Sequence, residues 1–519
     1  MDRRAFLRYA GRTALAAAGL TVLGAACRNA PGAPRATDPA FLGAASAKDW
    51  EAFGRSFAGR LIRPGDARYN RARKLFDPRF DVVHPSAIAI CRGPADVQQS
   101  IQFARGHGLD FAARSGGHSY AGYSTTDGLV CDLGGLSAVT VNPAAKTATV
   151  GAGAHLIDVY AALAQHGMAL PGGSCPTVGV SGLTLGGGQG VLGRKFGLTS
   201  DNLRSLRIVT AAGDLLTCDG QHNADLFWAC RGGGGGNFGV VTSFTFDVHP
   251  VGNLARFYCA WPWGAAHAVL HGWQSWAPHA PDALWSNCHL RAGAGQPAVS
   301  VSGVFVGTEA GLRTQVNHLI QAVGSAPSTK DVTSESLLGT MMLEAGCSDL
   351  SVAQCHLPSQ NPAGVLQRQI AKAKSDFFDH ALPPAGITAV IDAIEARLDD
   401  PQLQTGAGVG FDAYGGALNR PAAAATAFVH RDSLFLAQYS TRWSETSSPG
   451  VVHANTQWLS AFAKSMRPFA SGEAYQNYID PDRADWPHAY YGSNLPRLKN
   501  VKSKYDPHAF FEFAQSIPV

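Results

Sequence analysis

The chain has 519 residues, of which 45% are hydrophobic and 15% are charged, and this composition excludes an intrinsically disordered protein. The formal net charge is only +4 and no Lys/Arg block occurs, so we expect no binding to nucleic acid. The length is sufficient for about two to four domain cores. The 59 glycines follow no repeating period, which excludes collagen and favours a fold with many tight turns.

Residues 1–27 predict an export signal. An Arg-Arg-Ala-Phe-Leu-Arg segment at 3–8 precedes an apolar run at 14–26, and this arrangement resembles a twin-arginine signal peptide. The apolar run is shorter than the about 20 residues that cross a bilayer, so we expect no transmembrane span. We therefore predict export by the twin-arginine route to an extracellular or cell-envelope location, with an Ala- and Pro-rich linker at 28–44.

The sequence leaves two questions about the cysteines open: lipid attachment and disulfide formation. Cys27 ends a segment close to a lipoprotein box, but such boxes usually have a large aliphatic residue where this chain has Gly24, so a lipid anchor at Cys27 stays open. None of the 10 cysteines belongs to a C-x-x-C pair, so neither a zinc nor an iron–sulfur site is indicated, and we expect no metal. Cys347 and Cys355 flank a polar loop, and a disulfide between them outside the cell is the second open alternative.

The first half of the mature chain predicts a mixed α and β domain with two small βα units. An extended apolar stretch at 81–91 precedes a helix that opens at 93–96 and stops at Gly106, with Val97 and Ile101 on one face. A second amphipathic helix is expected at 155–165. Further strands are expected at 111–114, 129–133, 138–141, 147–150, 206–210, 215–217 and 240–248.

The pattern changes after residue 252 and predicts a separate α+β domain. Strands at 298–306 and 434–439 alternate with long amphipathic helices, which are expected at 311–323, 387–398 and 451–466. From residue 472 onward, aromatic and polar residues are crowded together, and an amphipathic segment at 499–513 follows.

Two familiar motifs are present but lack the context that their chemistry needs. Residues 188–193 fit G-x-G-x-x-G, but this fingerprint of dinucleotide-binding Rossmann folds belongs directly after a buried strand, and here it follows the glycine-rich segment 182–187. Residues 117–121 resemble the nucleophile elbow of serine hydrolases only loosely, because the last glycine is missing. Neither motif therefore predicts a function alone.

Three glycine clusters at 114–119, 171–180 and 231–239 suggest a different phosphate site. Glycines let backbone N–H groups approach a polyanion closely, so such loops can bind a pyrophosphate without lysines. The alternatives are ordinary turns or, for the five consecutive glycines, a flexible linker. Trp228 and Val240 flank the last cluster with apolar side chains, which argues against a linker.

Together these motifs closely resemble the berberine-bridge-enzyme group of FAD-linked oxidases, whose fold is that of vanillyl-alcohol oxidase. The resemblance rests on RSGGHS at 114–119, GGSCPTVGV at 172–180, LGGGQG at 185–190, RGGGGGNFG at 231–239 and, near the end, YQNY at 475–478 and YYGSN at 490–494. It covers residues 81–518. The resemblance implies an α+β fold with a two-subdomain FAD-binding domain at 45–250, an α+β substrate domain at 251–470, and a C-terminal berberine-bridge-type segment at 471–519 that returns to the FAD domain.

The resemblance also implies a doubly tethered FAD. His118 matches the histidine bonded to the flavin 8α-methyl carbon, and Cys175 matches the cysteine bonded to flavin C6, although a His and a Cys beside glycines are by themselves more often structural. Asn237 and Val241 are expected near adenine, and Tyr491 and Asn494 are expected to close over the flavin. The remaining cofactor-binding residues that the resemblance implies are Arg114, Ser115, Gly116, Gly117, Ser119, Val180, Gly182, Gly187, Gly188 and Gly190.

For the chemistry, the resemblance implies that Tyr478 is the catalytic base and that Gln438 and Tyr414 line the substrate face of the flavin. A phenol with a pKa near 10 is a poor base, so Tyr478 needs a positive or hydrogen-bonding neighbour to act. The alternative is that Tyr478 is a core aromatic. Val180 matches a position where a small residue admits O2, which favours an oxidase.

The resulting hypothesis is a secreted, bicovalent FAD oxidase that transfers hydride from an alcohol to flavin and reduces O2 to H2O2. We expect a sugar or a glycosylated metabolite as the alcohol. Two alternatives remain open: a dehydrogenase that uses another electron acceptor, and a non-catalytic secreted flavoprotein that binds a ligand.

Overall fold

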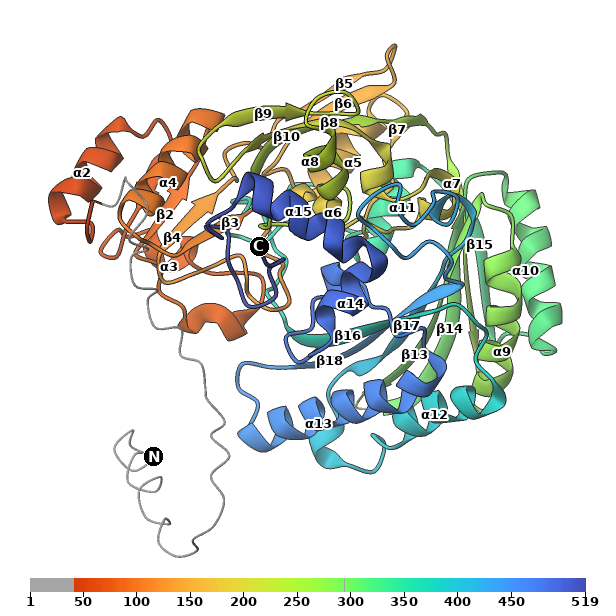
Figure 1. Ribbon diagram of the computed structural model, residues 1–519. Helices are drawn as coiled ribbons and strands as arrows, with labels where there is room; N and C mark the ends of the chain where they lie inside the picture. The colour runs from red at the N-terminus through yellow and green to blue at the C-terminus, as the bar shows by residue number, and fades with distance from the viewer. Residues whose placement is uncertain (1–41, 294) are drawn as a thin grey trace, which may run out of the picture. The chain divides into compact units, whose positions relative to one another are not determined.

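The computed structural model describes residues 42–293 and 295–519 of the chain. The predicted export signal, Cys27 and nearly all of the predicted linker lie outside the described residues. The described residues form an α+β structure with four sheets, and this confirms the expected fold class (Figure 1).

The first sheet has four strands in the order β1-β2-β4-β3 and is parallel except for its edge strand β1. The strands are β1 (Arg60–Ile62), β2 (Ala87–Ile90), β4 (Leu129–Asp132) and β3 (Phe111–Arg114). The predicted helix is present as α4 (Pro94–Gly106), where Pro94 occupies the first turn. Helix α2 (Ala47–Ser56) packs on α4 through stacked Phe53 and Phe103 rings, 4.4 Å apart.

The second sheet is antiparallel, with the strand order β5-β6-β10-β8-β9. Its strands are β5 (Val139–Asn142), β6 (Thr147–Gly151), β10 (Val240–Asp247), β8 (Leu203–Val209) and β9 (Leu215–Cys218), all at positions that the sequence predicted. Helix α5 (Leu156–Ala164) follows β6, and a two-stranded sheet joins β7 (Met168–Ala169) to β11 (His249–Pro250). One hydrophobic core connects the four-stranded and the five-stranded sheet, so the two sheets support the loops between their strands as a single unit.

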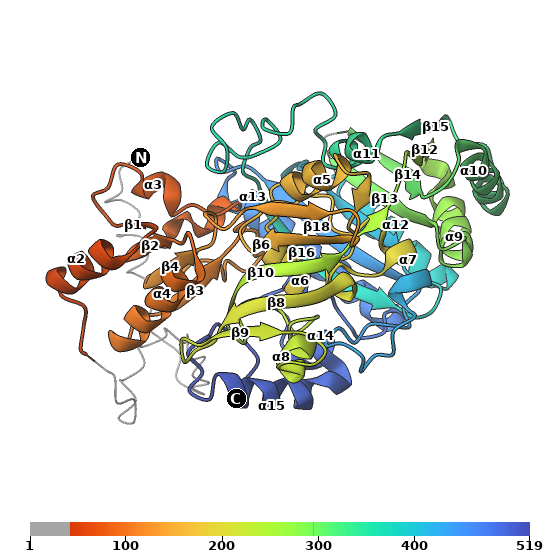
Figure 2. The same cartoon turned by 90° about the horizontal axis from the view of Figure 1, so that it is seen from above.

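The third large sheet has seven antiparallel strands in the order β15-β12-β14-β13-β17-β18-β16. The strands are β12 (Leu254–Trp261), β13 (Leu284–Gly293), β14 (Gly295–Phe305), β15 (Thr329–Glu335), β16 (Ile370–Phe378), β17 (Ala407–Ala413) and β18 (Phe435–Trp443). Helices α9 (Ala266–Trp276), α10 (Glu309–Val323), α12 (Pro384–Glu395) and α13 (Pro449–Met466) cover one face (Figures 1 and 2).

The two faces of this sheet differ in chemistry because side chains alternate along a strand. On β13, Cys288 and Leu290 point into the core under the helices, whereas Asn287 and His289 belong to the opposite face. On β14, Val299 and Val301 follow the same apolar pattern. The face opposite the helices carries polar side chains at Asn287 and His289, whereas Leu254, Trp285 and Val304 on the same face pack into a separate apolar cluster.

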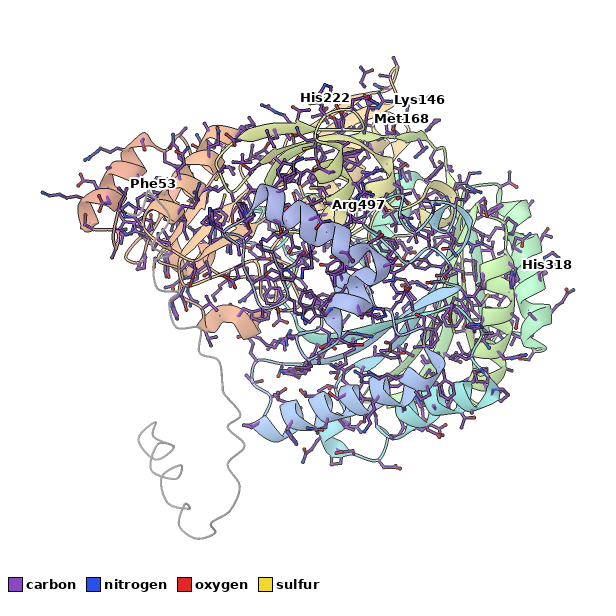
Figure 3. All side chains as sticks on the ribbon, in the orientation of Figure 1. Phe53, Lys146, Met168, His222, His318 and Arg497 are labelled. Carbon is purple, nitrogen blue, oxygen red and sulfur yellow. A yellow bond between two sulfur atoms is a disulfide. The ribbon has the colours of Figure 1, made fainter. Side chains whose placement is uncertain are left out.

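The C-terminal segment returns to the glycine-rich part of the first half. It contains helices α14 (Trp486–Tyr491) and α15 (Leu495–Tyr505), and Lys502 in the last turn of α15 forms a buried ion pair with Asp506, 2.6 Å apart. The Lys502 ammonium also donates to the Asn237 carbonyl at 2.7 Å. Arg497 on α15, labelled in Figure 3, lies over the Trp228 ring at 3.9 Å.

The structure settles one of the alternatives that the cysteines left open. Cys347 and Cys355 form a disulfide, which closes a short loop after helix α11 (Leu337–Glu344). Across the described residues, no helix has the length and apolar character needed to cross a membrane.

Candidate functional site

Three glycine-rich segments meet at very close range. The N–H groups of Gly232 and Gly234 donate to the Leu185 carbonyl at 3.0 and 2.9 Å. A Cβ atom on Gly116 would collide with the backbone nitrogen of Gly179. A Cβ atom on Gly232 would likewise collide with the Phe428 backbone, so these positions require glycine.

The same segments leave room for a ligand on one side. Gly182 is exposed, and a Cβ placed on it would meet no atom within 4 Å. Gly187 and Gly188 have φ angles of +116° and +84°, which turn the backbone in a way that other residues rarely adopt. Close backbone approach beside open space fits an elongated polyanion, as the sequence predicted for the pyrophosphate of FAD.

Several predicted cofactor residues use their side chains inside the protein. Arg114 donates to the Asp132 carboxylate at 2.7 Å, and the Ser115 hydroxyl donates to the Ala152 carbonyl at 2.7 Å. The Ser119 hydroxyl accepts from the Tyr123 N–H at 3.1 Å. These side chains fix the shape of the loop, so their expected contribution to cofactor binding comes through the backbone. Val180 is fully buried at the start of helix α6 (Val180–Leu185).

The residues expected around adenine and over the flavin also have internal partners. The Asn237 amide accepts from the Ile517 N–H at 2.9 Å, and Val241 is buried in the core of the second sheet. Asn494 donates to the carbonyls of Ala423 and Thr426 at 2.8 and 3.1 Å, so it positions that loop and is not directed at the glycine segments. Tyr491 does reach them, because its hydroxyl donates to the Gly233 carbonyl at 3.2 Å.

His118 is half-buried and has one free ring nitrogen. Its ring stacks on Phe76 at 4.0 Å, and Nε2 lies 2.8 Å from the Thr177 hydroxyl. Burial and the neighbouring His155 lower the pKa of His118 to about 3, so the imidazole is neutral. Among the described residues no hydrogen-bond partner faces Nδ1, which leaves a nucleophilic lone pair when Nε2 carries the proton.

Cys175 is the exposed free cysteine of the described chain. The other free cysteines there are buried: Cys91, Cys131, Cys218, Cys230, Cys259 and Cys288. Cys175 is thus the one accessible thiol in this part of the protein, at the position where the sequence predicted a tether.

Tyr478 belongs to a hydrogen-bonded group that comes from distant parts of the chain. The side-chain amide of Gln189 donates to the Tyr478 hydroxyl and to the Asp412 carboxylate, both at 3.1 Å. The Tyr120 ring lies parallel to the Tyr478 ring, with 5.9 Å between centroids. Gln438 donates to the Tyr120 hydroxyl at 3.0 Å. Since Tyr120 follows His118 by two residues, this group lies next to the predicted tether.

Tyr475 holds the backbone of this group in place. Its hydroxyl accepts from the Gly188 N–H at 2.9 Å and from the Asn477 amide at 2.8 Å. Its ring meets the Tyr478 ring edge to face, at 5.0 Å. The Y-x-N-Y motif therefore has one tyrosine that fixes the glycine loop and one that faces Gln189.

Burial raises the pKa values of the acidic side chains in and near this group by different amounts. Burial, and then the charge of Asp412, raises the pKa of Tyr478 well above its usual value of 10. Burial raises the pKa of Asp412 to about 6, although the Gln189 amide partly opposes the shift. Burial and Asp412 raise the pKa of Glu344, at the end of α11, to about 7. At neutral pH the phenol is protonated, and Asp412 is the member that can accept a proton.

The structure corrects the expectation for Tyr414. This residue is fully buried in an aromatic cluster with Phe377, Phe428 and Tyr475, and its hydroxyl has no hydrogen-bond partner. Its carbonyl accepts from Arg194. Tyr414 therefore packs beneath the site, and Asp412, two residues earlier in the chain, presents the functional group that sequence reasoning missed.

One further group of side chains could offer ligands to a metal ion. His155, Asp158 and His356 have ligand atoms within 4.8 Å of one another. His356 lies 3.0 Å from Asp158 through Nε2 and 2.9 Å from the Val352 carbonyl through Nδ1. These contacts tie the disulfide loop to α5. The sequence did not indicate this group because His356 and Asp158 are 198 positions apart.

Comparison with known proteins agrees with this geometry. Residues 85–219 match a family model described as an FAD binding domain, and residues 474–518 match one described as berberine and berberine like. An uncharacterized FAD-linked oxidoreductase of Bacillus subtilis, YgaK, is 35% identical over 465 residues, which cover 89% of this chain and 97% of the relative.

Solved structures resemble this chain over a similar share of its length. Physcomitrella patens BBE-like 1 has 32% sequence identity and a TM-score of 0.81, covering 90% of this chain and 99% of its own. A chitooligosaccharide oxidase has 26% identity and a TM-score of 0.80, with coverage of 90% and 99%.

Proposed function

Because the chain belongs to the berberine-bridge-enzyme-like family of FAD-linked oxidoreductases, we propose that it is an oxidase that removes hydride from an alcohol. The observation that carries this proposal is the hydrogen-bonded group of Tyr478, Gln189 and Asp412 beside His118. This group provides a proton acceptor next to the place where the flavin ring is expected.

The proposal includes covalent attachment of FAD to His118 and Cys175. A neutral imidazole with a free Nδ1 and an accessible thiol are the two nucleophiles that such attachment needs. The glycine segments would hold the pyrophosphate by backbone N–H groups. Bound FAD would accept hydride from the alcohol and pass the electrons to O2, forming H2O2.

The protein residues handle the proton. Oxidation of an alcohol requires that the hydroxyl proton moves to a base as hydride departs. We assign the contact with the substrate oxygen to Tyr478 and the final uptake of the proton to Asp412, which shares the Gln189 amide with Tyr478. Gln189 holds both acceptor oxygens through a single amide nitrogen, so it fixes their geometry during the transfer.

A sugar or glycoside is the alcohol class that the site favours. The face of the seven-stranded sheet opposite its helices presents Asn287, Ser302, His289 and Gln438, side chains that can form hydrogen bonds with hydroxyl groups. The structural similarity to a chitooligosaccharide oxidase supports the same class.

We further propose export by the twin-arginine route to the cell envelope or the medium. The signal pattern at 3–26 and the Cys347–Cys355 disulfide both support an oxidising compartment. Lipid attachment at Cys27 remains an alternative form of the same proposal.

Purified protein tests the function directly. A panel of sugars and glycosides should bleach the flavin anaerobically, and readmitted air should restore its absorbance with formation of peroxide. Bleaching without peroxide would indicate a dehydrogenase with another acceptor. A flavin that no alcohol bleaches would indicate a ligand-binding flavoprotein.

The Val180→Leu variant is expected to slow reoxidation by O2 while an artificial electron acceptor still supports turnover. Val180 is fully buried, so an added methylene has no solvent space to enter and must extend into the neighbouring site. Stopped-flow reoxidation of the reduced enzyme measures the effect. Equal reoxidation rates in both proteins would show that Val180 does not control access of O2.

A further inference from the structure

Two histidines and an aspartate from distant parts of the chain meet at the start of helix α5. His155 directly precedes the helix and Asp158 lies in its first turn. His356 follows the Cys347–Cys355 disulfide by one residue. The Oδ2 atom of Asp158 lies 3.7 Å from His155 Nδ1 and 3.0 Å from His356 Nε2. Three potential ligand atoms are therefore gathered within 4.8 Å of one another.

These separations are close to those around a tetrahedral metal ion. With metal–ligand bonds of about 2.0 to 2.1 Å, the ligand atoms of such an ion lie about 3.3 Å apart. The distances of 3.0 and 3.7 Å from Asp158 lie on either side of that value. The rings of His155 and His356 are nearly perpendicular, at 82° with 5.7 Å between centroids, so they do not stack on each other and can both address one ion.

A hydrogen bond on the other side of the His356 ring favours this role. His356 is buried, and its Nδ1 lies 2.9 Å from the Val352 carbonyl, which can only accept. Nδ1 therefore carries a proton, and Nε2 is directed at Asp158. Histidines that bind metals commonly donate the outer N–H to a carbonyl in this way, which fixes the ring and leaves the inner nitrogen for the ion.

The contact between His356 and Asp158 needs a positive charge. Burial raises the pKa of Asp158, but the two histidines outweigh this effect and hold the pKa below its usual range, so the carboxylate is ionised. A neutral His356 would direct the Nε2 lone pair at this carboxylate, and two acceptors repel. Either a second proton on His356 or a cation removes the repulsion. The proton satisfies His356 alone, whereas a cation also engages His155, whose Nδ1 is beyond hydrogen-bond distance of Asp158.

We propose that His155, Asp158 and His356 bind a divalent transition-metal ion such as Zn²⁺, with solvent completing the coordination. Two imidazoles and one carboxylate suit such an ion, whereas Mg²⁺ and Ca²⁺ prefer sites built from oxygen atoms. The side chains of His155 and Asp158 are 14% and 39% exposed, so an ion and a water molecule can enter from solvent. The expectation of no metal came from the cysteine pattern, which does not cover a site of this kind.

The ion would join two elements that hold the segment after Cys175. At the start of α5, the Leu156 N–H donates to the Val178 carbonyl at 3.0 Å. From the loop that follows the disulfide, the Gln360 amide donates to the Thr177 carbonyl at 3.1 Å. A metal bound between α5 and the disulfide loop would therefore stabilise this segment from both sides. The inference does not depend on the proposed alcohol oxidation.

Calorimetric titration with ZnCl2 tests the site on the full-length holoenzyme, treated with EDTA, desalted and kept free of reductant so that the disulfide stays intact. The wild type is expected to bind one Zn²⁺ per chain with a Kd of about 1 μM or tighter. MgCl2 and CaCl2 should not bind comparably. His155→Gln should weaken Zn²⁺ binding by about tenfold or more. This variant keeps the contact between His356 and Asp158, so its Tm in EDTA should match that of the wild type.

The matched control is His222→Gln, which should leave the Zn²⁺ affinity unchanged. His222 Nδ1 lies 3.1 Å from the Asp219 carboxylate, at the same three-residue spacing as His155 and Asp158, but the described part of the chain adds no third ligand there. Cys175→Ala should also keep the affinity, which separates the site from the exposed thiol.

Thermal unfolding provides a second measurement, because an ion that binds the folded protein raises its Tm. Zn²⁺ should raise the Tm of the wild type and of His222→Gln, but not that of His155→Gln. No Zn²⁺ binding by the wild type, or equal affinity in the wild type and His155→Gln, would overturn the metal site. Loss of binding in Cys175→Ala would place the ion on the thiol and would also overturn it.

Discussion

Replacing Asp412 by Asn is expected to slow flavin reduction by about 10²- to 10⁴-fold, the usual contribution of a general base. The amide keeps the shape of the side chain but cannot accept the proton that the substrate releases. FAD content should not change, because the Asp412 side chain contacts only the Gln189 side-chain amide and not the backbone N–H groups that are expected to hold the pyrophosphate. Anaerobic stopped-flow reduction by one good substrate measures the effect.

Tyr478→Phe should give a loss of similar size, and the double variant should be little worse than either single variant, because both residues act on one proton. The matched control is Tyr414→Phe, which removes a buried hydroxyl that has no partner. We expect that control to change the reductive rate by less than about threefold. Additive losses at Tyr478 and Asp412 would show that they serve separate steps.

Removing both predicted tethers is expected to abolish covalent attachment of FAD completely. His118→Ala and Cys175→Ala should each leave one bond, because the two nucleophiles belong to different loops and react independently. Intact mass after denaturation measures this directly. Cys259→Ala, which removes a buried free cysteine, should keep both bonds. A denatured wild-type protein with the mass of the bare polypeptide would contradict covalent attachment.

The sequence allowed accurate prediction wherever a local signal determines the local structure. Helix α4 begins at Pro94 and ends at Gly106, because a proline suits the first turn and a glycine interrupts the helical pattern. The alternating residues of β10 likewise marked a half-buried strand. Of the three glycine clusters that suggested a phosphate site, the structure places 114–119 against 171–180, and 231–239 against Leu185.

Strands β13 and β17 had no such signal. Gly408, Gly410 and Asp412 lack the β-branched or aromatic side chains that mark strands, and at Gly410 the His289 ring occupies the space of a side chain. The sequence also did not identify Asp412 as a functional residue, because its role depends on contacts that form only in the folded structure. Its partner Gln189 is 223 positions away, and the burial that raises its pKa depends on the folded structure. The hydrogen bonds of Asn494 were not predicted for a similar reason, since the loop it supports is far away in the sequence.

The pH dependence of anaerobic flavin reduction tests the central claim, that Asp412 receives the substrate proton, most directly. Burial raises the pKa of Asp412 to about 6, so the acceptor is ionised above that pH and protonated below it. We predict that the reductive rate falls about tenfold per pH unit below pH 6 and that this dependence disappears in Asp412→Asn. A wild-type rate that stays constant between about pH 5 and 8 would contradict the assignment.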